Sequence, residues 1–98
     1  MKLRWSPLAV DKASELAEYI GQDNPAAAEK WIDAVFSSVE RLTTFPESGR
    51  IVPEINSLAI RELLYGNYRI IYRIEEKQLS ILTIRHGRQV LPVDEIVA

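Results

Sequence analysis

The fold is decided by residues 59–86, AIRELLYGNYRIIYRIEEKQLSILTIRH, which are rich in isoleucine, leucine and tyrosine at alternating positions. Two turn signals divide this stretch. Gly66-Asn67 fits the two central residues of a type II′ hairpin turn, and residues 75–77 fit a short loop. We therefore expect three antiparallel strands, at about 59–65, 68–75 and 78–86.

Upstream of these strands, the sequence carries two helical patterns. Each begins with a capping residue followed by proline, at Ser6-Pro7 and Asn24-Pro25, and continues with apolar residues three and four positions apart. Gly21 is expected to end the first helix, and Phe45-Pro46 the second, because the residue before proline avoids the α region. The expected helices are 7–21 and 25–45, and their short connection makes them an antiparallel hairpin.

The remaining segments flank or connect these elements. Residues 2–6 form a short extended run that we expect at one edge of the sheet, residues 46–58 read as a loop, and residues 87–98 as a C-terminal tail. A chain of 98 residues is long enough for one hydrophobic core. We expect a single α+β domain over residues 1–98, in which the N-terminal strand and the two-helix hairpin pack on a C-terminal antiparallel sheet.

The composition excludes several classes of site. There is no cysteine, so the chain has neither a thiol nucleophile nor a cysteine-based zinc or iron–sulfur site, and one histidine cannot form a histidine-rich metal cluster. No glycine-rich phosphate loop is present either. We expect no cofactor and no metal. No apolar run approaches the ~18 residues of a membrane span, so we expect no membrane contact and a cytoplasmic location.

Charge is unevenly distributed along the chain. The net charge is −2, but residues 1–48 carry eight acidic and five basic side chains, whereas residues 49–93 carry four and seven. A polyanionic or acidic partner is therefore expected to meet the C-terminal half. The candidate binding residues are the arginines and the histidine of that half: Arg50, Arg61, Arg69, Arg73, Arg85, His86 and Arg88.

Strand alternation brings some of these arginines to one face of the sheet, because successive side chains point to opposite sides. We expect Ile74 to oppose Gln78 across the second turn. Arg69 then lies opposite Thr83, and Arg85 falls on the same side as Arg69. A one-residue slip would send Arg85 to the other face, so this clustering depends on the turn. The residues expected on the arginine side are Arg69, Ile71, Arg73, Leu79, Ile81 and Arg85.

The basic residues have two interpretations. Guanidinium groups suit phosphate or carboxylate, and histidine can move a proton near neutral pH, which favours a binding or catalytic surface. Alternatively, they are solvated charges on the open face of a one-sided sheet. Arg50 and Glu54, in the 46–58 loop, either bind a ligand or brace the loop. The acidic partners in the second interpretation are Glu62, Glu75 and Glu76.

Several segments together resemble the ParE/RelE superfamily of toxins from bacterial type II toxin–antitoxin modules, and most closely its ParE-like members. The combination of Gly-Asn-Tyr-Arg-Ile-Ile-Tyr with Arg-His-Gly-Arg one hairpin later is the most specific part. The topology expected above is the one that this family has. The matching segments are residues 5–9, 45–50, 61–63, 68–73 and 84–88.

The resemblance implies a growth-inhibiting protein that is neutralised by a cognate antitoxin, whose extended or helical segment wraps the toxin. RelE-like toxins cleave messenger RNA in the ribosomal A site, whereas ParE-like toxins inhibit DNA gyrase and are not nucleases. RelE-like cleavage relies on lysines before the central strands, on arginines that match Arg69 and Arg85, and often on a C-terminal tyrosine. Residues 47–64 contain no lysine, and no tyrosine follows Tyr72.

Some RelE relatives instead combine a glutamate, an arginine and a late histidine. Glu54 or Glu62 would supply the acid, and Arg69 and His86 the other two groups. A sequence pI near 5.4 does not suit a protein that enters an RNA-lined site. A ParE-like gyrase inhibitor is therefore the expected function. The alternatives are a RelE-like ribosome-dependent endoribonuclease and an inactive partner-binding module.

The resemblance also defines the expected partners. These are the antitoxin and DNA gyrase, or the ribosome and messenger RNA in the nuclease alternative. They are expected to meet the basic sheet face and residues 85–97, where Arg69, Arg85 and Arg88 would supply charge-assisted contacts. A homodimer and a toxin–antitoxin hetero-oligomer both remain open.

Overall fold

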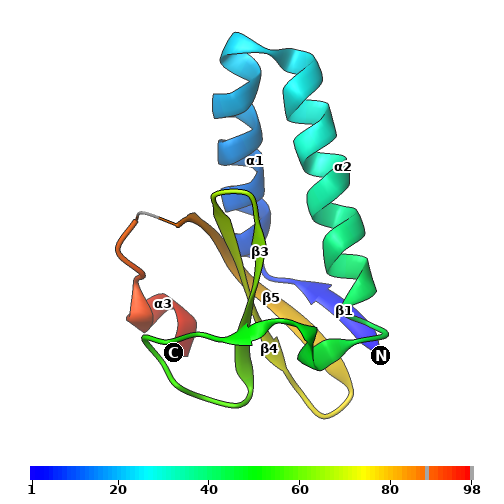
Figure 1. Ribbon diagram of the computed structural model, residues 1–98, viewed down its shortest axis with the longest axis vertical. Coiled ribbons are helices and arrows are strands. Elements are labelled where there is room, and N and C mark those ends of the chain that lie inside the picture. The colour runs from blue at the N-terminus through cyan, green and yellow to red at the C-terminus, as the bar shows by residue number, and fades with distance from the viewer. Residues whose placement is uncertain (88, 98) are drawn as a thin grey trace.

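The computed structural model describes residues 1–87 and 89–97, in which a helical hairpin stands over a sheet (Figure 1). The α+β fold class expected from the sequence is confirmed. The elements in chain order are β1 (Lys2–Trp5), α1 (Pro7–Asp23), α2 (Pro25–Arg41), the 3₁₀ turn η1 (Pro46–Ser48), β2 (Arg50–Ile51), β3 (Ile60–Tyr65), β4 (Tyr68–Ile74), β5 (Gln78–His86) and α3 (Val93–Val97).

The sheet has five strands in the order β1-β5-β4-β3-β2. Its three C-terminal strands, β3, β4 and β5, form the expected antiparallel meander and begin and end within one residue of the predicted positions. β1 joins the edge beside β5 in the parallel direction, so the complete sheet is mixed. At the other edge, β2 pairs with β3 inside the segment predicted as a loop, and this places Arg50 opposite Glu62.

The register between β4 and β5 differs from the expected one. Ile74 pairs with Leu79 rather than with Gln78, because the turn is one residue longer than expected. A β-bulge then adds a second one-residue displacement, since Tyr72 pairs with Ile81 but Ile71 pairs with Thr83. A single displacement would exchange the faces of β5, and the second one restores them.

The bulge decides where the arginines lie. Arg69 pairs with Arg85 instead of Thr83, and the two arginines share one face of the sheet, as the sequence predicted. The prediction that Leu79 and Ile81 share that face is wrong. They lie before the bulge and are buried in the core that faces the helical hairpin.

The two helices begin where the sequence predicts. The Ser6 hydroxyl accepts a hydrogen bond from the Ala9 amide at 3.0 Å and donates one to the Leu82 carbonyl at 2.9 Å, so it caps α1 and ties it to β5. Asn24 ends α1 and caps α2 through the Ala27 amide, 3.1 Å away. Gly21 does not end α1. It lies inside the helix, where an added methyl group would stand 3.4 Å from the Ala28 Cβ atom.

Helix α2 ends earlier than predicted, at Arg41 rather than near residue 45. The next residues continue as a tighter turn, in which the amides of Leu42, Thr43 and Thr44 each bond to the carbonyl three positions back. Threonine is a weak helix former, and the Thr43 hydroxyl also bonds to the Glu40 carbonyl at 2.7 Å. Competition from this side chain favours the turn over another helical turn.

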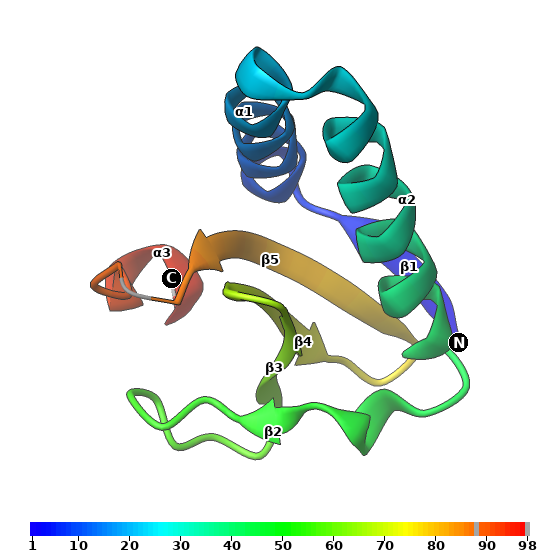
Figure 2. The same ribbon diagram turned by 45° about the horizontal axis from the view of Figure 1, so that its top comes forward.

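The two faces of the sheet are covered by different segments. The hairpin covers one face, and its apolar stripe, including Val35, Val39 and Leu42, packs on residues such as Ile70 and Ile84. The segment between β2 and β3 runs below the other face, and α3 lies beside the end of β5 (Figure 2). The side chains of this second core are Val52, Ile60, Ile71, Leu91 and Ile96.

The expectation of an open, one-sided sheet is therefore corrected. The predicted 46–58 loop contains η1 and β2, and the predicted tail contains α3. Both segments supply buried apolar residues, Val52 from the first, and Leu91 and Ile96 from the second. Among the described residues, no helix is long and apolar enough to cross a membrane.

The Tyr72 hydroxyl holds the connection between α2 and β2 in place through two hydrogen bonds. Its hydroxyl donates to the Pro46 carbonyl at 2.6 Å and accepts from the Gly49 amide at 3.0 Å. Burial raises the pKa of the phenol, so it stays protonated and able to donate. A Cβ atom on Gly49 would lie 2.5 Å from the Tyr72 hydroxyl and 2.7 Å from the Glu62 carbonyl, so only glycine fits this close approach.

Replacing Tyr72 with phenylalanine is expected to lower the free energy of unfolding by about 1–3 kcal/mol, because two backbone groups lose their hydrogen-bond partner. Urea unfolding of the Tyr72→Phe variant measures this loss. Tyr19→Phe is the control, since Tyr19 is 71% exposed on α1. Equal stability of the two variants would show that the Tyr72 hydroxyl does not hold η1.

Candidate functional site

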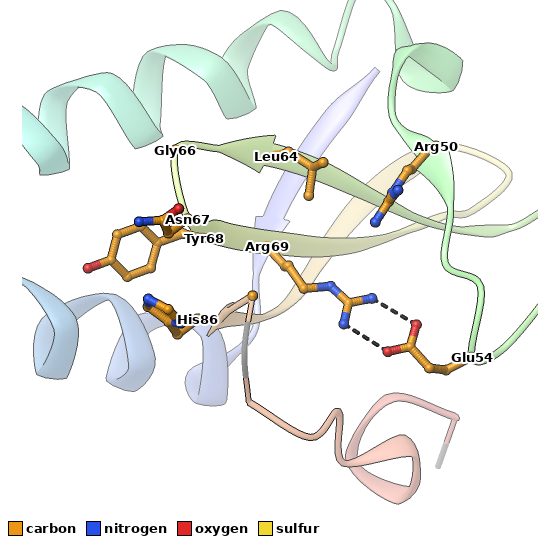
Figure 3. Close-up of a pocket in the computed structure, with 9 residues that line it drawn as sticks. Arg50, Glu54, Leu64, Gly66, Asn67, Tyr68, Arg69 and His86 are labelled. Carbon is orange, nitrogen blue, oxygen red and sulfur yellow. Dashed lines mark hydrogen bonds and ion pairs between the residues drawn. The ribbon is translucent and has the colours of Figure 1, made fainter.

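Arg69 is the centre of a network of charged side chains below the sheet. Its side chain is 9% exposed, and its Nε atom donates to Glu62 Oε1 at 2.5 Å. Its Nη1 and Nη2 atoms bind both oxygens of Glu54, at 2.8 and 2.9 Å, in the bidentate arrangement that guanidinium and carboxylate groups prefer (Figure 3). Two carboxylates of the chain therefore hold this arginine on two of its edges.

Glu62 is shared between two arginines. Its side chain is fully buried on β3, and its second oxygen accepts from Arg50 Nε at 2.5 Å. The pairing of β2 with β3 places Arg50 directly opposite Glu62, and the Arg69 side chain reaches the same carboxylate from β4. The four side chains carry two positive and two negative charges, so the network as a whole is neutral.

The ion pairs shift the ionisation of both Arg69 and Glu54. The hydrogen bonds from Arg69 lower the pKa of Glu54 from 4.5 to about 2, against a smaller opposing effect of burial. Bonding to Glu54 and then to Glu62 raises the pKa of Arg69 above its ordinary value. Both groups are thus fully charged at neutral pH, and each stabilises the charge of the other.

A pocket of about 390 Å³ opens beside this network. Arg69 points toward Glu54 at one end of it, and the rings of Tyr68 and His86 lie together at the other (Figure 3). The Gly66-Asn67 turn forms part of its rim, and Gly66 has a φ of 56°, as the first central position of a type II′ turn requires. The pocket is lined by Arg50, Glu54, Leu64, Gly66, Asn67, Tyr68, Arg69, His86 and Gly87.

His86 belongs to the opposite face of the sheet from Arg69. It pairs with Tyr68, and the two rings meet edge to face with centroids 5.5 Å apart. Tyr68 in turn contacts Trp31 on α2, with centroids 5.2 Å apart. The structure therefore places His86 in an aromatic group under the hairpin, while Glu54 and Glu62 are engaged by Arg69.

The other predicted basic residues are dispersed. Arg61 donates to the carbonyls of Gly49, at 3.1 Å, and Leu58, at 3.2 Å. Arg73 donates to the Ile96 carbonyl at 2.8 Å and so ties α3 to the sheet. Arg85 lies across from Arg69 on the same face. Arg88 lies outside the described residues. Of the predicted set, the structure brings together Arg50, Glu54, Glu62 and Arg69, with Arg85 as their neighbour.

Sequence reasoning missed the apolar and turn residues of the pocket, such as Leu64 and Tyr68. A signal was present, because the predicted hairpin turn directly precedes Arg69 and brings these residues to the same end of the sheet. Within residues 1–87 and 89–97, no group of three or more histidine and acidic side chains is placed to hold a metal ion. The outer donors of Arg69 suit a planar anion, as the bidentate contact with Glu54 shows.

Solved structures with the same fold come from toxin–antitoxin systems. The chain matches a structure of the chromosomal ParDE toxin–antitoxin system from P. aeruginosa with a TM-score of 0.73 and 21% identity, over 88% of this chain and 95% of that one. It matches the crystal structure of the toxin–antitoxin complex RelBE2 from Mycobacterium tuberculosis with a TM-score of 0.59 and 19% identity, over 87% and 88%. The fold is thus the one found in these toxin–antitoxin systems.

Sequence comparison gives the family. Residues 3–91 match the family described as the ParE toxin of type II toxin–antitoxin systems, parDE. The putative toxin Y4kP of Sinorhizobium fredii is 34% identical over 93 residues, which are 93% of each chain. Toxin RelE2 of Caulobacter vibrioides is 29% identical over 84 residues, 85% of this chain and 91% of that protein. The chain therefore belongs to the ParE toxin family and is the toxin of a type II toxin–antitoxin module.

Removal of Arg69 is expected to destabilise the protein far more than removal of Arg50. Arg69→Ala leaves the buried Glu62 carboxylate without its buried partner, at a cost of about 3–5 kcal/mol. Arg50→Ala removes a side chain that is 57% exposed, at a cost of roughly 0–1 kcal/mol. Chemical denaturation of both variants measures the difference. Equal losses would mean that Arg69 does not hold the network together.

The Glu54–Arg69 pair is expected to make stability depend on pH below the ordinary range of a glutamate. Because folding lowers the pKa of Glu54, the pair contributes fully above pH 4.5, and its contribution is lost as the pH falls to about 2. Unfolding of the wild type and of Glu54→Gln should therefore differ most above pH 4.5 and converge toward pH 2. Glu76→Gln, in the exposed β4–β5 turn, is the matched control. A constant difference across this range would contradict the assignment.

Proposed function

We propose that this toxin inhibits growth by blocking DNA gyrase, does not cleave RNA, and is neutralised by a cognate antitoxin. The observation that carries the proposal is the internal pairing of Arg69, the residue that matches an arginine of the RelE-like cleavage set. Its donors are directed at Glu62 and Glu54 rather than toward an open surface. An arginine held in this way is poorly placed to stabilise charge on a reacting phosphate.

The arrangement of the acid–base groups supports the same conclusion. A general base must lie within hydrogen-bond reach of the proton that it removes. Glu54 and Glu62 are both bonded to Arg69, and His86 packs against Tyr68 on the hairpin side of the sheet. The histidine-containing nuclease set would therefore need rearrangement before it could act on a ribose hydroxyl.

Charge also favours a protein target over RNA. The chain has a net charge of −2, and its most conspicuous arginines are paired with carboxylates. Affinity for RNA rises with the number of phosphates that free cations neutralise. The absence of lysine from residues 47–64 removes further cations from the edge of the sheet. These features favour a toxin that binds a protein target.

Membership of the family is the reason for proposing an antitoxin as the partner of this chain. Both similar solved structures are described as toxin–antitoxin systems or complexes, and we propose a partner of that kind for this chain. Its action on gyrase would place the toxin in the cytoplasm. The similarity to Toxin RelE2 keeps open the RelE-like alternative named from the sequence, ribosome-dependent cleavage of messenger RNA, as the competing function.

Two assays separate these functions. The purified toxin is expected to inhibit DNA supercoiling by gyrase and to leave messenger RNA on stalled ribosomes uncut. Neither the wild type nor His86→Ala should cleave ribosome-bound messenger RNA, since no catalytic role is assigned to the histidine. Lys30→Ala, at an exposed position of α2, is the matched control. Cleavage of ribosome-bound messenger RNA, lost in His86→Ala while gyrase stays active, would overturn the proposal.

A further inference from the structure

The two carboxylates that bind Arg69 differ in how deeply their side chains are buried. Glu62 lies on β3, its side chain is fully buried, and it binds the Nε atom of Arg69. Glu54 lies on the connection between β2 and β3, and its side chain is 40% exposed. Among the described residues, the hydrogen bonds to the outer edge of the guanidinium group come from a carboxylate that borders solvent.

Displacement of Glu54 from Arg69 would move its side chain but need not move the backbone around it. Val52, two residues earlier, is fully buried in the second core, and Ile55, the next residue, packs against the same core. The peptide segment is thus fixed on both sides, and only the Glu54 side chain would have to rotate for a ligand to take its place on the outer edge of the guanidinium group. Glu62 would continue to hold Nε, so Arg69 would keep its direction toward the pocket.

Departure of Glu54 changes the charge of the site. The network of Arg50, Glu62, Arg69 and Glu54 is neutral when complete, and without Glu54 it carries one net positive charge. With Glu54 in place the Arg69 side chain is 9% exposed, so an anion that takes the position of Glu54 would cover the guanidinium group in the same way and make the same charge-assisted bidentate contact.

The ligand best suited to this position is a carboxylate. Glu54 itself shows that a planar pair of oxygens fits the two outer donors of Arg69. The buried charge of Glu62 on the inner edge of the same guanidinium group disfavours a phosphate monoester, which carries more negative charge than a carboxylate. Leu64 and Tyr68 supply apolar wall to the pocket, which suits the carbon chain of an acidic side chain.

We propose that Glu54 is an internal substitute for a carboxylate of the partner protein, and that an acidic side chain of the antitoxin displaces Glu54 from Arg69 when the two proteins bind. This proposal rests on the proposed function only in taking the antitoxin as the partner. It predicts that Glu54 weakens binding, because the apparent dissociation constant is the intrinsic one divided by the fraction of molecules with the site open.

The first test uses small peptides and the full-length toxin. The probe is a peptide blocked at both ends with one glutamate between two leucines, and its counterpart has glutamine in place of glutamate. Binding is followed by the NMR signal of the Arg69 Nε–H group. If the site is open in a tenth of molecules, Glu54→Ala should bind the glutamate peptide about tenfold more tightly than the wild type. Glu76→Ala is the control of equal charge change.

The possible results of this test either support the proposal or overturn it. Tighter binding of the glutamate peptide by Glu54→Ala, with no gain for the glutamine peptide or in Glu76→Ala, supports the proposal. Equal affinity of the wild type and Glu54→Ala would overturn it. So would tighter binding of inorganic phosphate than of the glutamate peptide, which would indicate a phosphate-bearing ligand instead of a carboxylate. Because this measurement requires neither gyrase nor growth inhibition, failure of the proposed function leaves its result intact.

Discussion

The buried carboxylate of Glu62 is the constraint on which the lower half of the molecule depends. A charge that is fully removed from water must be compensated by opposite charge and hydrogen bonds, or it destabilises the fold by several kcal/mol. Arg50 and Arg69 provide that compensation from the strands on either side of β3. Glu62 therefore joins β2, β3 and β4 through side chains as well as through backbone hydrogen bonds.

Because of this constraint, several basic side chains of the C-terminal half have a structural role. The excess of arginines suggests a positive surface, yet four of these side chains have structural partners. Arg50 and Arg69 neutralise glutamates, and Arg61 and Arg73 donate to backbone carbonyls that hold η1 and α3 in place. The outer edge of the Arg69 guanidinium group borders a pocket and is covered by Glu54. Among the described residues, these pairings leave less free positive charge than the number of arginines suggests.

Much of the architecture is readable from local sequence, because caps, prolines and alternation act over a few residues. Ser6-Pro7 and Asn24-Pro25 start the helices, and Gly66-Asn67 makes the hairpin turn. The errors arise where distant segments meet. The predicted loop forms β2 only because β3 is available to pair with it, and the tail forms α3 where Leu91 and Ile96 find the second core.

The sequence by itself determined the α+β class, the order of the two long helices and of β1, β3, β4 and β5, the family, and the candidate arginines and glutamates from which the charged network is built. Only the tertiary structure decided which of them meet. The bulge in β5 sets the face of Arg85, the β2–β3 pairing delivers Arg50 to Glu62, and His86 falls on the other side of the sheet. Strand register and side-chain pairing depend on contacts between residues far apart in the chain, which local preferences do not encode.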